Sequence, residues 1–437
     1  MRILYFTQFY KPESIAAAFR ACDHARYWAK AGCDVVVFTG WPNYPTGRVF
    51  DGYKVERLGE ERDGDVRVLR SKSVVAPNTS MARRVLGGGS WLAYGILNCV
   101  LQKRRIGPLP DVVLATSGTV FAAMVGRFFA KRNRVPLVVE FRDLTYRQMA
   151  ATGSDGRGWK VRLMRRLELS LCRDADRVVA LTEGFKEALV AEGVPAEKID
   201  VVPNGADIVP CRHEWSGAGA LRLGYFGTMG ISQDVPATLD LASALAKTGA
   251  RVSYLLVGEG AARSLVEEGV ASGAYPFAEL RHAVSKDELE PLYASVDMTV
   301  VSLQKSGGFA GTIPSKIFQS FARGVPVLFC GPEGEACRLV RDSGAGLALT
   351  GTAEEAARAL ADFASDPELP KRLARMSESA VEFMEAGYTR RAMAERTLRI
   401  LEGVRRRRLE RSAAAKGALR PDDALCSDER SSQVSDS

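Results

Sequence analysis

An alternation of apolar strands and helical stretches runs through this chain twice and constrains the fold more than any other feature. The strand candidates are β-branched runs that end in turn or cap residues, which is typical of parallel strands buried on both faces. Helical patterns separate them, and the alternation restarts at Leu221. The expected strands are Ile3–Thr7, Asp34–Thr39, Val66–Ser71, Val112–Thr116, Leu137–Phe141, Arg177–Leu181, Ile199–Val202, Leu221–Gly227, Val252–Val257, Glu279–His282, Met298–Ser302 and Val327–Cys330.

Two consecutive βα repeats predict an α/β protein with two Rossmann-like domains that face each other across a cleft. We expect the domains at 1–207 and 221–385, with a linker at 208–220. A C-terminal helix within 386–411 is long enough to cross back over the first domain. Residues 412–437 are rich in Ser, Asp, Ala and Arg without periodicity, so we expect a disordered tail.

Composition narrows the class of protein. The apolar and charged fractions, 46% and 26%, are those of a soluble globular protein. The 8 cysteines form no Cys-x-x-Cys pair, so neither a zinc site nor a disulfide framework is expected, and a reducing cytoplasm fits best. The longest apolar stretch, Trp91–Leu101, is shorter than the ~20 residues that a spanning helix needs. The N-terminus begins with a strand, so no signal peptide is expected.

A glycine-rich loop, Gly307–Gly311, leads into Pro314-Ser315-Lys316 and a short apolar helix. Glycines let backbone N–H groups approach an anion, and the positive end of the following helix points at the same place. Lys316 adds a mobile positive charge. The loop is therefore a candidate phosphate site, although an ordinary loop-to-helix junction has the same pattern.

Four segments, in this order and spacing, resemble motifs of the retaining glycosyltransferases of family 4. They are Cys172–Glu183, Lys198–Asp207, Leu256–Gly260 and Leu292–Asp297. The resemblance extends from Met1 to about Val404. It implies the GT-B fold, with an acceptor-binding first domain and a nucleotide-sugar-binding second domain.

A narrower resemblance is to bacterial transferases that include L-fucosamine and colanic-acid-type enzymes. It is carried by Gln8–Glu13 with Thr39–Gly47, by Glu140–Leu144 and by Pro314–Lys316. It implies transfer of a sugar from a UDP- or GDP-linked donor to a saccharide on polyprenyl diphosphate, in O-antigen, capsule or exopolysaccharide assembly.

The resemblance also implies retention of configuration and no cofactor or obligatory metal. Without a metal, helix N-termini, backbone amides and cations must stabilise the leaving diphosphate. We expect two loops of the second domain to touch the diphosphate, a strand end to meet the base, and Gln319 to meet a ribose hydroxyl. The expected donor-binding residues are Gly227, Thr228, Met229, Gly230, Gly258, Glu259, Arg281, His282, Ala283, Gly311, Thr312, Ile313, Pro314, Ser315, Lys316 and Gln319.

The chain departs from the family motif in which two glutamates are separated by seven residues, because Gly311 and Gln319 stand at these positions. A sugar contact would then have to come from the Gly311–Thr312 backbone. Because both glutamates are missing, a second interpretation stays open. In it the chain is a degenerate GT-B protein that binds nucleotide sugar or a partner transferase without catalysis. A GT-B nucleotide-sugar 2-epimerase is a further alternative.

On the acceptor side, Glu13, Arg142 and Asp143 follow strands at the sheet edge where ligands bind in such folds. Either carboxylate could deprotonate an acceptor hydroxyl. A structural pair between Arg142 and Asp143 is an equal alternative. Asn43 and Tyr44 could line the acceptor path, although Pro-Asn-Tyr-Pro is also ordinary turn sequence.

Two basic segments with aromatic and aliphatic residues, 67–110 and 159–166, suit an anionic membrane surface. They suggest a cytoplasmic protein, peripheral at the inner face of the cytoplasmic membrane. Packing of their apolar residues on the domain core is the alternative, and no nucleic-acid-binding module is recognised. Asp63-Gly64-Asp65 has the spacing of a metal-binding motif, but a hairpin turn is preferred there.

Overall fold

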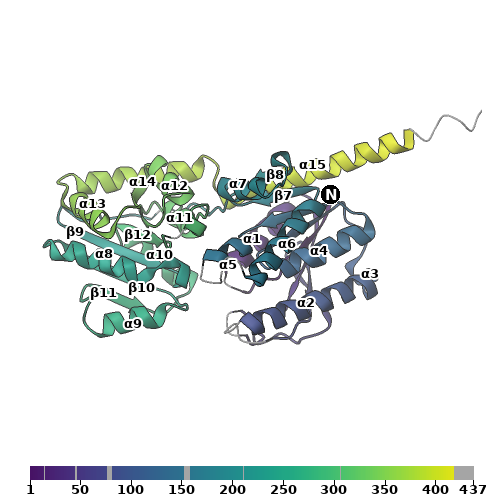
Figure 1. Ribbon diagram of the computed structural model, residues 1–437, viewed down its shortest axis with the longest axis horizontal. Coiled ribbons are helices and arrows are strands. Elements are labelled where there is room, and N and C mark those ends of the chain that lie inside the picture. Colours follow the sequence, from purple (N-terminus) through teal and green to yellow (C-terminus); the bar gives the residue numbers. More distant parts are fainter. Residues whose placement is uncertain are drawn as a thin grey trace, which may run out of the picture.

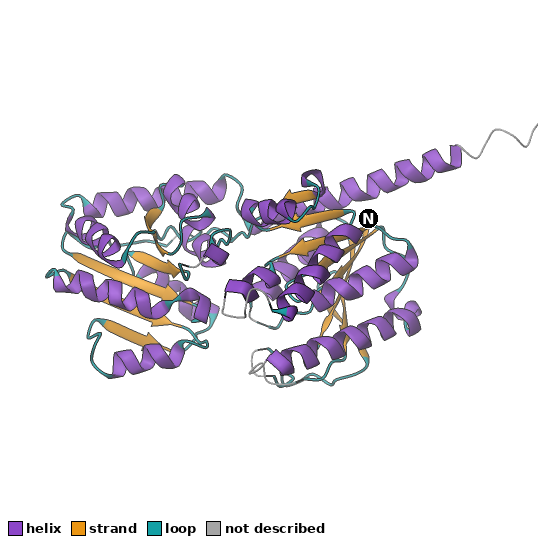
Figure 2. Cartoon of the chain, in the orientation of Figure 1, coloured by secondary structure: helices purple, strands orange, loops and turns teal. Residues whose placement is uncertain are grey.

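The computed structural model describes residues 1–417 except 14, 45–46, 76–80, 152–157, 210 and 306. Two lobes lie side by side, each built on its own sheet with helices on both faces (Figures 1 and 2). The predicted pair of βα domains is therefore confirmed.

The first sheet has eight strands in the order β3-β4-β2-β1-β5-β6-β7-β8, and only β3 runs antiparallel to its neighbour. Ile3 at its centre pairs with Val35 on one side and Val112 on the other. The strands are β1 Arg2–Phe6, β2 Asp34–Gly40, β3 Leu58–Asp63, β4 Val66–Ser71, β5 Val112–Thr116, β6 Leu137–Phe141, β7 Arg177–Ala180 and β8 Ile199–Val201.

Helices cover both faces of this sheet and bury two separate cores. One core packs under α2, α4 and α6, and the other under α1 and the C-terminal helix α15. The helices of the first domain are α1 Ala16–Lys30, α2 Met81–Leu101, α3 Lys103–Ile106, α4 Val120–Asn133, α5 Thr145–Ala151, α6 Trp159–Asp174 and α7 Glu183–Ala191, with a short 3₁₀ turn at Ala196–Lys198.

The second sheet has six parallel strands in the order β11-β10-β9-β12-β13-β14. Its strands are β9 Ala220–Phe226, β10 Arg251–Val257, β11 Ala278–Arg281, β12 Met298–Ser302, β13 Val327–Cys330 and β14 Gly346–Leu349. Its helices are α8 Val235–Lys247, α9 Arg263–Ala271, α10 Lys286–Ala294, α11 Ser315–Phe321, α12 Glu335–Asp342, α13 Ala353–Ser365 and α14 Leu369–Glu385, with 3₁₀ turns η2 Ile231–Gln233 and η3 Gly307–Phe309.

The final helix, α15 Arg390–Gly417, returns to the first domain. Trp28 donates its indole N–H to the Ala394 carbonyl at 2.9 Å, and Tyr27 donates to Glu395 at 2.5 Å. The predicted crossing helix is confirmed.

Two predictions about boundaries need correction. The expected tail begins too early, because α15 continues through 412–417, and its remainder at 418–437 lies outside the described residues. Strand β14 was not predicted, because its short Gly-Leu-Ala-Leu sequence carries no β-branched residue.

Candidate functional site

The carboxyl ends of β9 and β10 are joined backbone to backbone. The Gly227 N–H donates to the Val257 carbonyl and the Met229 N–H to the Glu259 carbonyl, both at 2.8 Å. A Cβ on Gly258 would lie 1.9 Å from the Gly227 oxygen, so only glycine allows this approach. These two loops form one rigid edge at which backbone groups are exposed. The Met229 side chain itself is buried in the core, so this residue can meet a ligand only through its backbone.

Lys316, in the first turn of α11, reaches that same edge. Its ammonium donates to the Thr228 carbonyl at 3.1 Å and lies 3.6 Å from the centroid of the Tyr225 ring. Removal from water lowers the pKa of Lys316 to about 7. No carboxylate among the described residues forms an ion pair with it. The structure therefore brings Lys316 to Gly227 and Thr228, as predicted from sequence, and leaves its charge available to an anion.

Gln319, one turn further along α11, is held by Arg323. The Arg323 guanidinium donates to the Gln319 side-chain oxygen at 3.1 Å and forms an ion pair with Glu290 at 2.5 Å. Its other side faces the Tyr293 ring, 4.4 Å from the centroid. This bond fixes the orientation of the Gln319 amide and uses one of the two lone pairs of its oxygen.

The glycine-rich loop uses part of its backbone internally. The Gly311 carbonyl accepts from the Thr182 hydroxyl at 2.7 Å, and the Thr312 N–H donates to the Phe309 carbonyl at 2.9 Å. Ile313 packs against the core beside it, and Pro314 precedes α11. Two of the four polar backbone groups at Gly311 and Thr312 are thus already bonded, which limits the sugar contact expected there.

The residues expected to meet the base lie on exposed strand ends. His282 contacts Glu259 at 2.7 Å, and this hydrogen bond lowers the pKa of Glu259. The Ala283 N–H donates to the same carboxylate at 3.4 Å, whereas Arg281 pairs with Glu279 at 2.6 Å. Glu259, His282 and Ala283 therefore form one cluster, and the Arg281 side chain turns away from it.

On the acceptor side, Glu13 supports a loop. Its buried carboxylate accepts from the backbone N–H groups of Asn43 and Tyr44, both at 3.0 Å, and of Tyr10 at 3.4 Å. Burial raises the pKa of Glu13, and these hydrogen bonds oppose the rise. The three predicted residues Glu13, Asn43 and Tyr44 do lie together. The contacts give Glu13 a positioning role, and its catalytic role stays a prediction.

Arg142 and Asp143 follow β6 at the same edge of the first sheet. Asp143 accepts from the Gln148 amide at 2.8 Å, and burial raises its pKa to about 6. Burial also lowers the pKa of Arg142. Among the described residues, no ion pair within 4.0 Å joins the two side chains, but the charge of Arg142 still opposes the rise in the pKa of Asp143.

The two domains touch beside the glycine-rich loop. Glu335, at the start of α12, accepts from the backbone N–H groups of Glu183 and Gly184 at the start of α7, the first at 3.1 Å. A carboxylate is favoured there because the N-terminus of a helix carries partial positive charge. Thr182 caps α7 and also holds Gly311. These contacts connect the loop directly to the first domain.

Comparison with known proteins agrees with this geometry. Residues 17–205 match the family described as glycosyl transferase 4-like domain. A relative, the 2-deoxystreptamine glucosyltransferase of Streptomyces kanamyceticus, is 25% identical over 331 residues, which are 70% of this chain and 81% of that protein.

Solved structures match over both domains. Sucrose-phosphate synthase from Thermosynechococcus elongatus superposes with a TM-score of 0.70 at 15% identity, covering 92% of this chain and 98% of that one. Anabaena HepE in complex with UDP-glucose gives a TM-score of 0.62 at 18% identity, covering 92% and 100%. The fold is GT-B. The domain match and the fold together support a glycosyltransferase of the GT-B type.

Sequence reasoning missed three groups at this GT-B site. Tyr225 lies under Lys316, Arg323 holds Gln319, and Glu335 joins the domains. Tyr225 stands two residues before Gly227 at the end of a predicted strand. This position in the sequence could have identified it as a residue of the site. The other two depend on contacts between distant segments.

The basic segments divide between core and surface. Arg67 and Arg70 form ion pairs with Glu60 and Glu61. Arg70 and Trp91 are buried, so these two do not belong to an exposed surface. Residues 76–80 lie outside the described residues. Helices α2 and α6 do expose large apolar side chains, namely Val85, Leu86, Leu97, Leu101, Trp159 and Leu163.

A groove of about 600 Å³ lies between α2 and α4 and is lined by apolar and basic side chains, of which Arg127 and Lys131 form ion pairs with Asp174. Its lining residues are Leu92, Ile96, Met124, Arg127, Phe128, Lys131 and Arg132. No helix in the described part of the chain is long and apolar enough to cross a bilayer.

Asp63, the first residue of the Asp-x-Asp sequence, is buried in a structural cluster. It accepts from the Tyr10 hydroxyl at 2.9 Å, from Arg26 at 2.9 Å and from Lys11. Gly64 makes the β3–β4 turn with a φ of 60°, so the preferred hairpin is confirmed. Among the described residues, no three His, Cys, Asp or Glu side chains are grouped as a metal site.

Proposed function

We propose that this protein is a retaining, metal-independent glycosyltransferase that uses a UDP- or GDP-linked sugar. The observation that carries the proposal is Lys316, a desolvated cation without a carboxylate partner beside the joined β9 and β10 loops. A diphosphate would supply the missing negative charge as it forms, which is how a site without a metal stabilises this leaving group. The HepE complex with UDP-glucose, a structural neighbour, supports a nucleotide-sugar donor.

We further propose that the acceptor is a saccharide on polyprenyl diphosphate, used in O-antigen, capsule or exopolysaccharide assembly. Glu13 holds Asn43 and Tyr44, and Asp143 with a pKa of about 6 provides a carboxylate at neutral pH. The acceptor lipid would be reached at the inner face of the cytoplasmic membrane. The exposed apolar side chains of α2 and α6 beside basic residues support that location.

The test is nucleotide release from UDP- and GDP-sugars in the presence of a saccharide on polyprenyl diphosphate. We expect release with one donor, and Lys316→Ala should weaken donor binding by about tenfold or more. The control Lys305→Ala removes a lysine that bonds the Gly351 carbonyl elsewhere in the same domain.

Membrane association is tested separately by co-sedimentation with phosphatidylglycerol vesicles. Leu97→Gln with Leu101→Gln should reduce the bound fraction, whereas Leu265→Gln, which changes an equally exposed leucine on α9, should not. Equal binding of all variants would exclude α2 as the contact surface.

A second candidate is a GT-B protein that binds a nucleotide sugar without catalysis. Gly311 and Gln319 replace the motif glutamates, and the Gly311 carbonyl is already bonded to Thr182. Donor binding without turnover across the same panel would support this candidate and exclude the first.

A further inference from the structure

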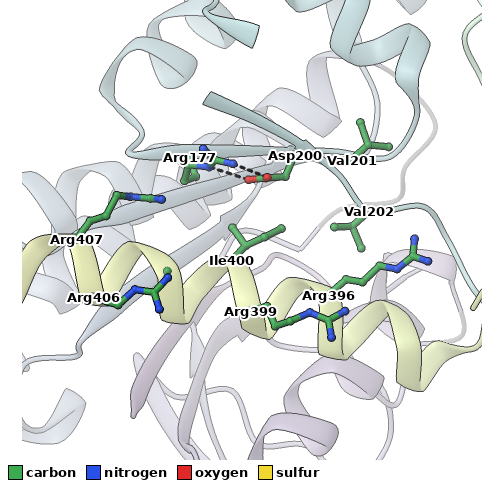
Figure 3. A pocket seen from close by; sticks show the side chains of 10 residues that line it. Arg177, Asp200, Val201, Val202, Arg396, Arg399, Ile400, Arg406 and Arg407 are labelled. Atoms are coloured by element: carbon green, nitrogen blue, oxygen red, sulfur yellow. Dashed lines mark hydrogen bonds and ion pairs between the residues drawn. The ribbon is translucent and has the colours of Figure 1, made fainter. Parts of the chain in front are cut away.

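A second charged groove lies in the first domain, between α15 and the edge of its sheet (Figure 3). Its volume is about 400 Å³. One wall is the face of α15 that carries Arg396, Arg399, Arg406 and Arg407. The other wall comes from β7, β8 and the residue after β8, and its lining residues are Arg177, Asp200, Val201 and Val202.

The arginines of α15 give this groove an excess of positive charge. Arg177 is neutralised by Asp200, with 2.7 Å between Nε and Oδ2. In contrast, no ion pair is formed by Arg396, Arg399, Arg406 or Arg407 with any acidic group in the described ranges. Two acidic residues lie near these arginines without forming an ion pair with them. Hydrogen bonds with Tyr27 and Arg391 lower the pKa of Glu395, and the charge of Arg399 adds to this lowering. Glu402 is exposed, three residues from Arg399 and four from Arg406. Arg396 and Arg399 are three residues apart, and like charges at this spacing on a helix repel each other unless an anion lies between them.

The floor of the groove is open at Gly403. Glycine inside a helix is destabilising relative to alanine. Nothing within 4 Å would obstruct a Cβ at this position, so packing does not demand the glycine. Its missing side chain instead leaves space between Arg399 and Arg406. Ile400 with Val201 and Val202 makes the rest of the floor apolar.

We propose that this groove is an anion site for a ligand with at least two phosphoryl groups. A guanidinium binds phosphate through paired N–H donors, which suits arginine better than lysine. Arg399 and Arg406 are seven residues apart, about 10 Å along the helix, a spacing that two linked phosphoryl groups match better than one. The ligand would be a soluble oligophosphate or a lipid headgroup with two phosphates. It would bind the arginines of α15, and the groove is separate from the donor loops of the second domain.

Calorimetric titration with tripolyphosphate tests the proposal. Arg399→Ala with Arg406→Ala should weaken groove binding by about tenfold or more. Gly403→Leu should block the site without removing charge, and the folded protein should be at least as stable because leucine favours the helix. Arg408→Ala is the control, since this exposed arginine belongs to the same run but does not line the groove. All titrations are repeated with Lys316→Ala, which should weaken binding at the donor site.

Co-sedimentation with phosphatidylcholine vesicles, with and without cardiolipin, distinguishes the two sources of phosphate. Loss of tripolyphosphate binding in Gly403→Leu supports a soluble anion. Loss of cardiolipin-dependent sedimentation alone supports a headgroup. If both groove variants match Arg408→Ala with both probes, the proposal is wrong.

Discussion

Lys316 contacts an aromatic face and a carbonyl oxygen, and desolvation lowers its pKa to about 7. A bound diphosphate would favour the charged form, so donor binding should take up a proton. Affinity should therefore be constant below about pH 7 and fall by up to tenfold per pH unit above it, until the pKa of the bound state is reached.

Calorimetry with a nucleotide sugar at several pH values would measure this dependence. A nucleotide sugar is preferred to a free nucleotide because its phosphates do not titrate near neutral pH. Lys316→Met should bind weakly and show no such slope. A wild-type affinity that stays level between pH 7 and 9 would contradict the assignment.

Asp143 has a pKa raised to about 6 by burial, so it is ionised at neutral pH and becomes protonated as the pH falls. If it accepts the proton of the acceptor hydroxyl, kcat/KM should decrease as pH falls through about 6. Asp143→Asn should lower kcat by about 100-fold or more.

A variant of Gln148 gives a second test of whether Asp143 accepts the proton of the acceptor hydroxyl. Its hydrogen bond to Asp143 lowers the pKa of that carboxyl, so Gln148→Ala should move the acidic limb of the pH profile to higher pH. An unchanged acidic limb in this variant would show that another group titrates.

At the scale of single elements, the β3–β4 hairpin is tied to the first domain by Asp63. Hydrogen bonds from Arg26, Lys11 and Tyr10 hold the pKa of Asp63 below its usual value despite burial. Asp63→Asn would leave the two cations without a counter-charge. Because both cations are partly exposed, we expect a loss of about 2–3 kcal/mol in the free energy of unfolding.

Chemical denaturation would measure this loss, with Asp65→Asn as the matched control. Asp65 is exposed in the same turn, so its substitution should change stability by about 0.5 kcal/mol at most. Equal stabilities of the two variants would mean that the cluster around Asp63 contributes nothing.

At the scale of the whole molecule, Glu335 connects the domains through the amides of Glu183 and Gly184. Glu335→Ala should loosen this contact, because the first amides of α7 would have no acceptor from the second domain. We expect faster hydrogen exchange in a peptide covering 182–190.

Glu333→Ala is the control for this exchange measurement. Glu333 contacts Arg341 and Thr350 within its own domain, so exchange at the start of α7 should not change. Identical exchange in both variants would mean that the inter-domain contact does not persist in solution.

Local patterns were sufficient to predict most strands, but the helix α2 at Met81–Leu101 was not predicted from them. The central strands are uninterrupted apolar runs such as Asp34–Gly40 and Val112–Thr116, and their signal does not depend on distant residues. The cap of α7 is also a local contact, because the Thr182 hydroxyl accepts from the Phe185 N–H at 3.1 Å. Lys316 and the loop at Gly227 followed from the same reasoning, because parallel strands end at one edge of a sheet.

Contacts between segments that are distant in sequence determined the features that local patterns did not predict. Whether a charged side chain forms an ion pair depends on which residues the fold brings close to it. Arg70 and Asp63 are buried in ion pairs, whereas Lys316 and Arg399 are left without a carboxylate within the described ranges. Such pairs join residues far apart in sequence, as Glu335 does with Gly184, so no local periodicity encodes them. The amino-acid pattern therefore specified two Rossmann-like domains and pointed to Lys316 as a candidate phosphate-binding residue, and tertiary packing determined which charges remain available to bind.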